Sequence, residues 1–281
     1  MFTRLDVRVD DANSLMLRYN FASAGNDPPT NRLPGDAYEF SSLGTRVESR
    51  SHSVVGQWLS NLSPTLTNDF LVNVQFLRDS ETPVSLFPRV DVGLQGVVDG
   101  AGFTRDLRAG SNFLGQDSQL DQDILQITNA LTLSVGDHQL TVGGGFERFA
   151  IGREYLPGAR GTYRFNRPAD LEANAPSEYI VHLPLTADAG TTDFAVNQFS
   201  AFVQEEMKVA DALNIRLGLR MDLPTMPDDP LANPAVENAF GIQTNSLPSG
   251  RELFSPRFGF NLGLGPDRAT QVRGGAGLLT G

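Results

Sequence analysis

Leu213-Asn-Ile-Arg-Leu-Gly-Leu-Arg-Met-Asp222 is the stretch of sequence that decides the fold. Every second residue from Leu213 to Met221 is apolar, and the residues between them are polar, charged or glycine. Successive side chains of a β-strand point to opposite faces, whereas a helix would scatter both sets around its circumference. The stretch therefore predicts a strand with one apolar face and one polar face.

The same alternation recurs along the chain and predicts an all-β protein. Clear examples lie at 69–76, 125–135, 139–147 and 257–264, with Asn129 as a polar exception. The patterns at 47–60 and 196–209 are weaker because both faces are mixed. We count about ten strands of roughly ten to fourteen residues, which is long against the ~5–6 residues usual for soluble sheets.

Short and long connections alternate strictly between these strands. Five short, polar connections carry residues that turn a chain at low cost; they lie at 10–14, 61–65, 136–138, 210–212 and 265–268. Four long connections far exceed the usual ~4–6 residues; they lie at 22–46, 79–123, 153–195 and 223–255. This asymmetry is typical of an antiparallel, up-and-down transmembrane β-barrel with short periplasmic turns and long extracellular loops.

Composition excludes several classes of function. The net charge of −11 over 281 residues argues against a nucleic-acid partner, because phosphates are neutralised by Lys and Arg. The absence of cysteine excludes disulfides and thiolate metal sites. No apolar run approaches the ~20 residues of a membrane helix, and the first residues do not resemble a signal peptide.

Catalytic and metal-binding patterns are not evident either. His52, His138 and His182 lie on separate segments without partners at ligand spacing, so we expect no metal site. Glu205 and Glu206 are adjacent, so on a strand they point to opposite faces and cannot act on one substrate. We therefore expect no catalytic residues and no cofactor, and a protein that is not an enzyme.

Two charged groups have plain structural interpretations. An acidic cluster in the second long connection is expected to be a solvated loop rather than a calcium site; it comprises Asp117, Asp121 and Asp123. Four arginines on polar faces of neighbouring C-terminal strands would form a basic stripe in a barrel; they are Arg216, Arg220, Arg257 and Arg273. We favour pairing of these arginines with Asp222, Glu147 or Glu206 over contact with a solute.

Several segments resemble the barrel of TonB-dependent outer-membrane receptors, specifically the Oar-like group. These segments are HQLTVGGGFERF at 138–149, GTYRFN at 161–166, FVQEEM at 202–207, LGLRMD at 217–222, LFSPRFGF at 253–260 and QVRGGAGLLTG at 271–281. Their order and spacing over 124–281 are specific, whereas residues 1–123 contribute only the general pattern. Met207 departs from the family, which favours Trp there.

The resemblance implies that residues 1–281 are part of a receptor barrel in the bacterial outer membrane, without plug domain, TonB box or signal peptide. Such a chain would contribute barrel wall and ligand-facing extracellular loops to energised uptake or surface binding. Its expected partners are outer-membrane lipid and the TonB complex, the latter acting through the missing plug. The substrate stays unknown.

A barrel assigns the two faces of each strand to different surroundings. The residues expected to face the lumen are Glu147, Gln204, Glu206, Arg216, Arg220, Asp222, Arg257, Asn261 and Arg273. Those expected to face lipid are Leu131, Leu133, Leu140, Val142, Phe146, Ile215, Leu217, Leu219, Phe258 and Phe260. The alternative is a soluble, secreted all-β carbohydrate-binding module, whose apolar faces would pack sheet against sheet.

Overall fold

The computed structural model describes residues 1–26, 37–116, 118–184, 190–265 and 269–279. Ten strands form one antiparallel sheet in which each strand pairs with its neighbours in chain order. They are β1 (Phe2–Arg8), β2 (Asn13–Asn26), β4 (Thr45–Ser63), β5 (Leu66–Pro83), β8 (Ser118–Val135), β9 (His138–Tyr155), β12 (Thr191–Ala210), β13 (Leu213–Thr225), β14 (Leu253–Leu264) and β15 (Thr270–Gly277). The predicted all-β, up-and-down architecture is confirmed.

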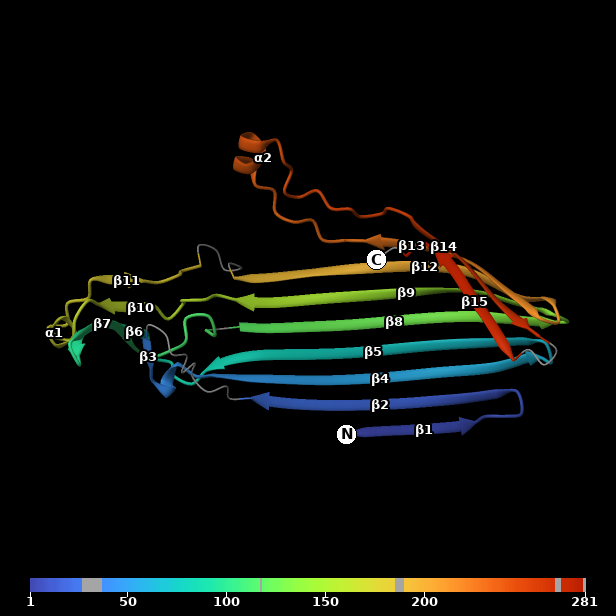
Figure 1. Ribbon diagram of the computed structural model, residues 1–281, viewed down its shortest axis with the longest axis horizontal. Helices are drawn as coiled ribbons and strands as arrows, with labels where there is room; N and C mark the ends of the chain where they lie inside the picture. Colours follow the sequence, from blue (N-terminus) through green and yellow to red (C-terminus); the bar gives the residue numbers. More distant parts are fainter. Residues whose placement is uncertain (27–36, 117, 185–189, 266–268, 280–281) are drawn as a thin grey trace.

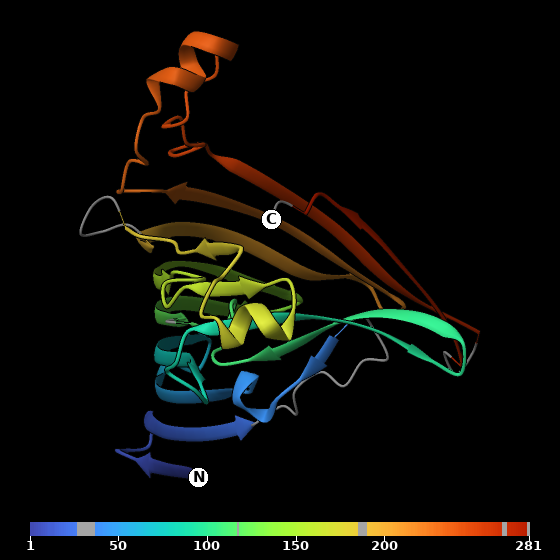
Figure 2. The same cartoon turned by 90° about the vertical axis from the view of Figure 1, so that its left-hand side faces the viewer.

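The sheet is a single curved wall that does not close on itself (Figures 1 and 2). Among the described residues, β1 and β15 pair on one side only, so they form its two edges. Five strands are longer than predicted: β4 has 19 residues, β5, β8 and β9 have 18, and β12 has 20. At ~3.3 Å per residue each of these spans roughly 60 Å, because the pairing continues into stretches that the sequence pattern assigns to loops.

Four of the five short connections turn where the sequence predicts, whereas most of the fifth, at 265–268, lies outside the described residues. Between β8 and β9 only Gly136 and Asp137 are unpaired, and Gly136 has φ +59°, the left-handed conformation that such tight hairpins need. Between β1 and β2 the Asp10 carboxylate accepts the backbone N–H groups of Ala12 at 2.8 Å and Asn13 at 2.7 Å. At one end of the wall, here called the turn end, the strands are therefore connected by short turns.

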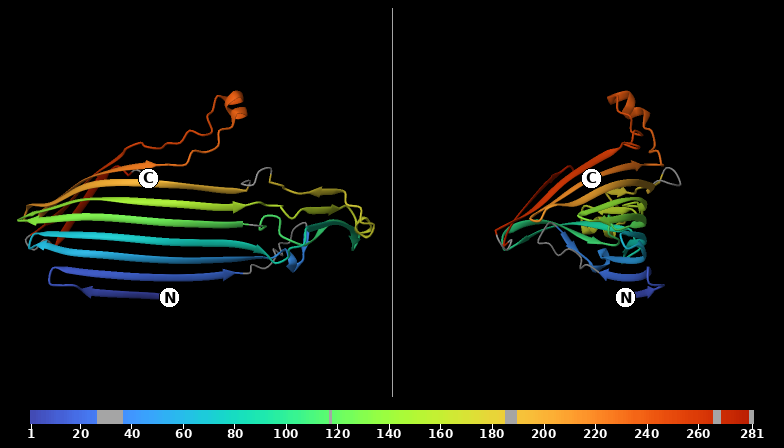
Figure 3. Two further views of the ribbon diagram at one scale, coloured as in Figure 1. Left: turned by 180° about the vertical axis from the view of Figure 1, so that it is seen from behind. Right: turned by 90° about the vertical axis from the view of Figure 1, so that its right-hand side faces the viewer.

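The long connections contain strands that have no clear signal in the sequence pattern. They hold a second sheet, the loop sheet, in the order β11-β10-β6-β7-β3. Its strands are β3 (Ala37–Glu39), β6 (Arg89–Val98), β7 (Ala101–Ala109), β10 (Thr162–Phe165) and β11 (Glu178–Ile180). Three different connections supply them, joined by the parallel pairs β3–β7 and β6–β10. The loop sheet extends the molecule beyond the opposite end of the wall, here called the loop end (Figure 3).

Short helical segments complete the connections. The 3₁₀ turn η1 spans Ser41–Leu43, and the helices are α1 (Pro168–Glu172) and α2 (Pro234–Phe240). Helix α2 is capped by the Asn233 side chain, which accepts the N–H of Ala235 at 3.1 Å. None of the described helices has the length and apolar character needed to cross a membrane.

The described part of the chain has almost no dry interior. Its buried apolar residues are Leu43, Val55, Val92, Phe165 and Ala195. Val92 and Phe165 belong to the loop sheet, so the ten-stranded wall buries few side chains of its own. A sandwich of this size would bury most of one face of each sheet; this wall does not.

Candidate functional site

Strand register places all nine residues of the predicted polar set on one face of the wall. Glu206 lies opposite Arg216, Gly218 lies between Gln204 and Arg257, and Asn261 lies between Asn214 and Arg273. Directly opposite residues share a face, and alternate residues along a strand return to it. The polar face is therefore continuous from β9, which carries Glu147, to β15.

Two of the four arginines on the polar face, Arg216 and Arg220, pair with carboxylates, whereas Arg273 donates to the neutral side chain of Gln271. Arg220 donates to both carboxylate oxygens of Asp222 at 2.7–3.0 Å, and Asp222 also accepts from Gln198 at 3.0 Å. Arg216 donates to Glu206 across the β12–β13 ladder, with Nε at 3.0 Å. The preferred interpretation of Arg216 and Arg220 as paired residues thus holds, although Asp222 lies on the same strand as Arg220 and not on its neighbour.

One part of this face is hollowed near the turn end. A depression of about 320 Å³ is lined there by polar side chains of four adjacent strands. Those polar residues are Glu206, Asn214, Arg216, Asn261 and Arg273. Two arginines and one glutamate give it a net positive charge.

The ten predicted apolar residues lie together on the opposite face. Leu131 pairs with Val142, Leu133 with Leu140, and further along the sheet Ile215 pairs with Phe260 and Leu217 with Phe258. Six of the ten are 40–49% exposed: Leu131, Leu133, Val142, Leu217, Leu219 and Phe258. No described element covers this face, so it is an apolar surface far larger than a soluble monomer usually exposes.

The apolar face forms a band that runs diagonally across the strands. Phe76 of β5 is the last apolar residue of its row toward the loop end, and its partner on β8 is Asp123. Asp123 lies opposite Ala150 of β9, but the last large apolar residue on this face of β9 is Phe146, four positions nearer the turn end. A band that steps in this way follows from strands that tilt relative to its long direction, as they do in barrels.

Charged and polar side chains border the band toward the loop end. Arg78 lies 2.6 Å from Asp123 and 3.7 Å from Asp121, and Arg148 donates to Asn197 at 3.0 Å. The expectation of a solvated acidic loop is therefore wrong for Asp121 and Asp123, which lie on β8 and pair across the ladder. Asp117 lies outside the described residues.

One contact on the apolar face has no signal in the sequence. His138 Nδ1 and Glu205 Oε1 are 2.6 Å apart near the turn end, although 67 positions separate them. Glu205 shares this face with Leu140, its direct partner, while Glu206 points to the polar face as predicted. Among the described residues no group of three or more His, Asp or Glu side chains is placed to hold a metal ion.

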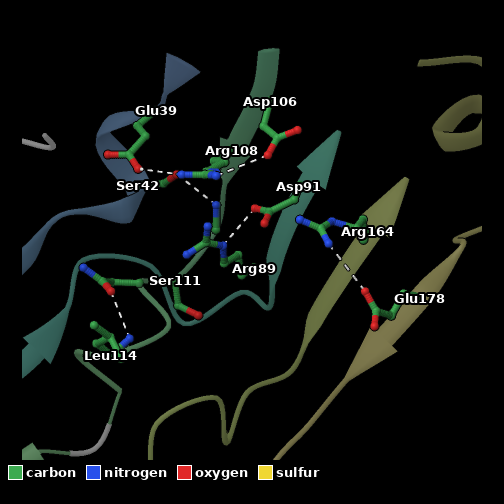
Figure 4. A network of polar contacts seen from close by, with 12 residues as sticks. Glu39, Ser42, Arg89, Asp91, Asp106, Arg108, Ser111, Leu114, Arg164 and Glu178 are labelled. Carbon is green, nitrogen blue, oxygen red and sulfur yellow. Dashed lines mark hydrogen bonds and ion pairs between the residues drawn. The ribbon is translucent and has the colours of Figure 1, made fainter. Parts of the chain in front are cut away.

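The loop sheet carries charges on one face and aromatic rings on the other. Figure 4 shows the charged side chains, which run across the strands from Glu39 to Glu178. Arg108 lies 3.2 Å from Asp106 and 3.7 Å from Glu39. On the other face the rings of Tyr163 and Tyr179 stack at 4.5 Å.

A comparison with family models matches residues 1–281 to the outer membrane beta barrel domain. The chain belongs to this family. The predicted localisation in the outer membrane is thereby confirmed, and the soluble-module alternative loses its support. No curated protein matches the chain.

Solved structures agree with the outer membrane beta barrel domain. The outer membrane transporter YddB from Escherichia coli has a TM-score of 0.64 at 11% identity, over 98% of this chain and 31% of that one. The ferric-catecholate import receptor Fiu from E. coli K12 has a TM-score of 0.52 at 13% identity, over 94% of this chain and 44% of that one. At such identity the likeness concerns the fold, and the domain spans less than half the length of either protein.

Proposed function

We propose that this domain is part of the wall of an Oar-like TonB-dependent receptor, that it contributes extracellular loops to energised uptake or surface binding, and that it catalyses no reaction. The uncovered apolar face carries the proposal. Six large apolar side chains at 40–49% exposure gain a favourable environment when lipid covers them. The likeness to an outer membrane transporter and to an import receptor supports a role in transport.

In this arrangement the polar face lines a lumen and the turn end faces the periplasm. The edge strands β1 and β15 join further strands of the cylinder, because an unpaired backbone group in lipid costs several kcal/mol. The positively charged hollow near the turn end then lies where a plug would sit, with Arg273 able to meet a carboxylate. The TonB complex would act on that plug.

Trp58, the sole tryptophan, tests the assignment of the faces. It lies on the apolar face between Leu15 and Phe70. Phospholipids brominated along their acyl chains are expected to quench its fluorescence strongly in reconstituted protein. The matched control moves the ring by one position, to the polar face, in a W58F/Q57W variant, which we expect the same lipids to quench weakly. Equal quenching of the two proteins would contradict the assignment.

A second experiment tests the plug in the complete receptor. A photo-crosslinking amino acid in place of Asn214, which lines the polar hollow, is expected to form a crosslink to a plug segment of the same polypeptide. The same amino acid in place of Leu213, on the other face, is expected to crosslink only to lipid. Absence of the intramolecular product at position 214 would remove the support for a TonB-type mechanism.

A further inference from the structure

A hollow of about 400 Å³ opens on the charged face of the loop sheet. Three strands and one connecting segment line it. The lining residues are Arg89 and Asp91 on β6, Asn112, Phe113 and Leu114 on the segment, Thr162 and Arg164 on β10, and Glu178 and Ile180 on β11. All of these residues lie in stretches for which the sequence pattern predicts loops.

The charges in the hollow balance. Arg89 donates to Asp91 at 2.8 Å, and both side chains are largely buried. Arg164 and Glu178 form a looser pair at 3.7 Å, and about half of each side chain is exposed. The hollow therefore offers N–H donors and carboxylate acceptors side by side, without net charge.

Thr162 carries an unmet hydrogen-bonding group at this place. Its residue is only 7% exposed, and its hydroxyl oxygen has no hydrogen-bond partner among the described residues. On the ladders Thr162 lies between Arg89 and Ile180, both of which line the hollow, so its side chain is on the same face. A buried hydroxyl without a partner costs roughly 1–3 kcal/mol. Because this oxygen is covered in the structure, a bound molecule offsets that cost when the neighbouring side chains move aside and uncover it.

The walls of the hollow are held in place by buried contacts. Gln116 is fully buried; its Nε2 donates to Ser111 at 2.7 Å and its Oε1 accepts the Arg160 N–H at 2.8 Å. The Phe113 ring packs edge-on against His182, with centroids 5.4 Å apart. A site formed in advance of binding loses less entropy when a ligand enters.

We propose that this hollow binds a neutral saccharide. Sugar hydroxyls both donate and accept, so they satisfy Arg164, Glu178 and the Thr162 hydroxyl together. The C–H faces of a sugar ring suit the apolar wall of Phe113 and Leu114. A charged ligand would repel one member of each ion pair and leave the other without its partner.

This inference deepens the proposed function, because it names the class of ligand that the extracellular loops capture. The test measures binding directly. The complete receptor, reconstituted in lipid, is applied to an array of maltotriose, cellotriose, chitotriose and lacto-N-tetraose, with sialyllactose and chitosan trimer as charged competitors. We expect at least one neutral glycan to bind more tightly than both charged ones.

Two variants connect this binding to the hollow. Thr162→Val removes the unpartnered hydroxyl, so the unfolding midpoint is expected to stay equal or rise. The affinity for the neutral glycan is expected to fall by about fivefold, which corresponds to the loss of one hydrogen bond. Glu178→Ala is expected to lower the affinity for the neutral glycan at least tenfold. The matched control, Asp106→Asn, alters a carboxylate of the same sheet outside the hollow and is expected to leave affinity within twofold.

The inference is overturned if no neutral glycan binds, if a charged competitor binds more tightly, or if Thr162→Val and Glu178→Ala bind as tightly as the parent. These outcomes are distinct from failure of the proposed function. Binding that survives when Asn214 yields no plug crosslink would refute the TonB mechanism alone. A plug crosslink without glycan binding would refute the saccharide site alone.

Discussion

Leu131 and Thr132 are consecutive on β8 and lie on opposite faces of the wall, so they measure the difference between the two faces at one depth. Leu131 is near the middle of the apolar row from Leu125 to Val135 and is 40% exposed. Thr132 lies on the polar face, where its hydroxyl contacts that of Thr141 at 3.1 Å. Each is replaced by arginine.

The two substitutions are expected to differ strongly. Arginine near the bilayer midplane costs about 2–4 kcal/mol on a lipid-facing position, which at 1.4 kcal/mol per factor of ten is roughly a 30- to 700-fold shift in the unfolding equilibrium. On the polar face, Thr132→Arg loses one cross-strand pair, worth about 0.2–1 kcal/mol. The side chain itself stays in water.

The assay is denaturant unfolding of the protein reconstituted in phospholipid vesicles, followed by the fluorescence of Trp58. The unfolding free energies of L131R and T132R are compared with that of the parent. Equal costs for the two variants, or a greater cost for T132R, would refute the assignment of the apolar face to lipid.

Three further predictions concern local structure. Gly143→Val is expected to lower the unfolding midpoint, at a cost of about 1–3 kcal/mol, because a Cβ there meets the Phe202 ring and stands 2.7 Å from the Asn129 carbonyl oxygen. Gln116→Ala is expected to cost the loop sheet about 1–3 kcal/mol, seen as faster proteolysis within 156–184 while the wall stays resistant. Hydrogen bonds, above all from the Asn13 side chain, lower the pKa of Asp10; its contribution to stability is therefore present above the unfolded value of about 4 and is lost as the pH falls through the lowered folded pKa. Faster hydrogen exchange of the β1–β2 turn at acid pH, absent in Asp10→Ala, checks this.

The sequence predicts the wall well because its information is local. In β13 the alternation of apolar and polar residues from Leu213 to Asp222 is enough to assign each residue to a face. The register between neighbouring strands then follows from the short turns. The same alternation assigns Glu205 and Glu206 to opposite faces, as the ladder between β9 and β12 confirms.

The loop sheet escapes prediction because its pairing is not local. Strands β10 and β11 have only four and three residues, too few to show a period. Strand β11 pairs with β10 of the same connection, but the other partner of β10 is β6 of a different connection, as Arg89 lies opposite Thr162. The pairs Arg78–Asp123 and His138–Glu205 escape for the same reason, since ladder register brings together residues that the sequence separates.

The parallel pairs β3–β7 and β6–β10 join three of the long connections into one sheet. A long connection that made no such pairs could lengthen or change its side chains with no effect on the others. Here an insertion near Arg89 displaces Thr162, and one near Glu39 disturbs Arg108. A new ligand specificity would therefore have to arise by coordinated replacements in several long connections. The alternative is single substitutions that leave the parallel strand pairs intact.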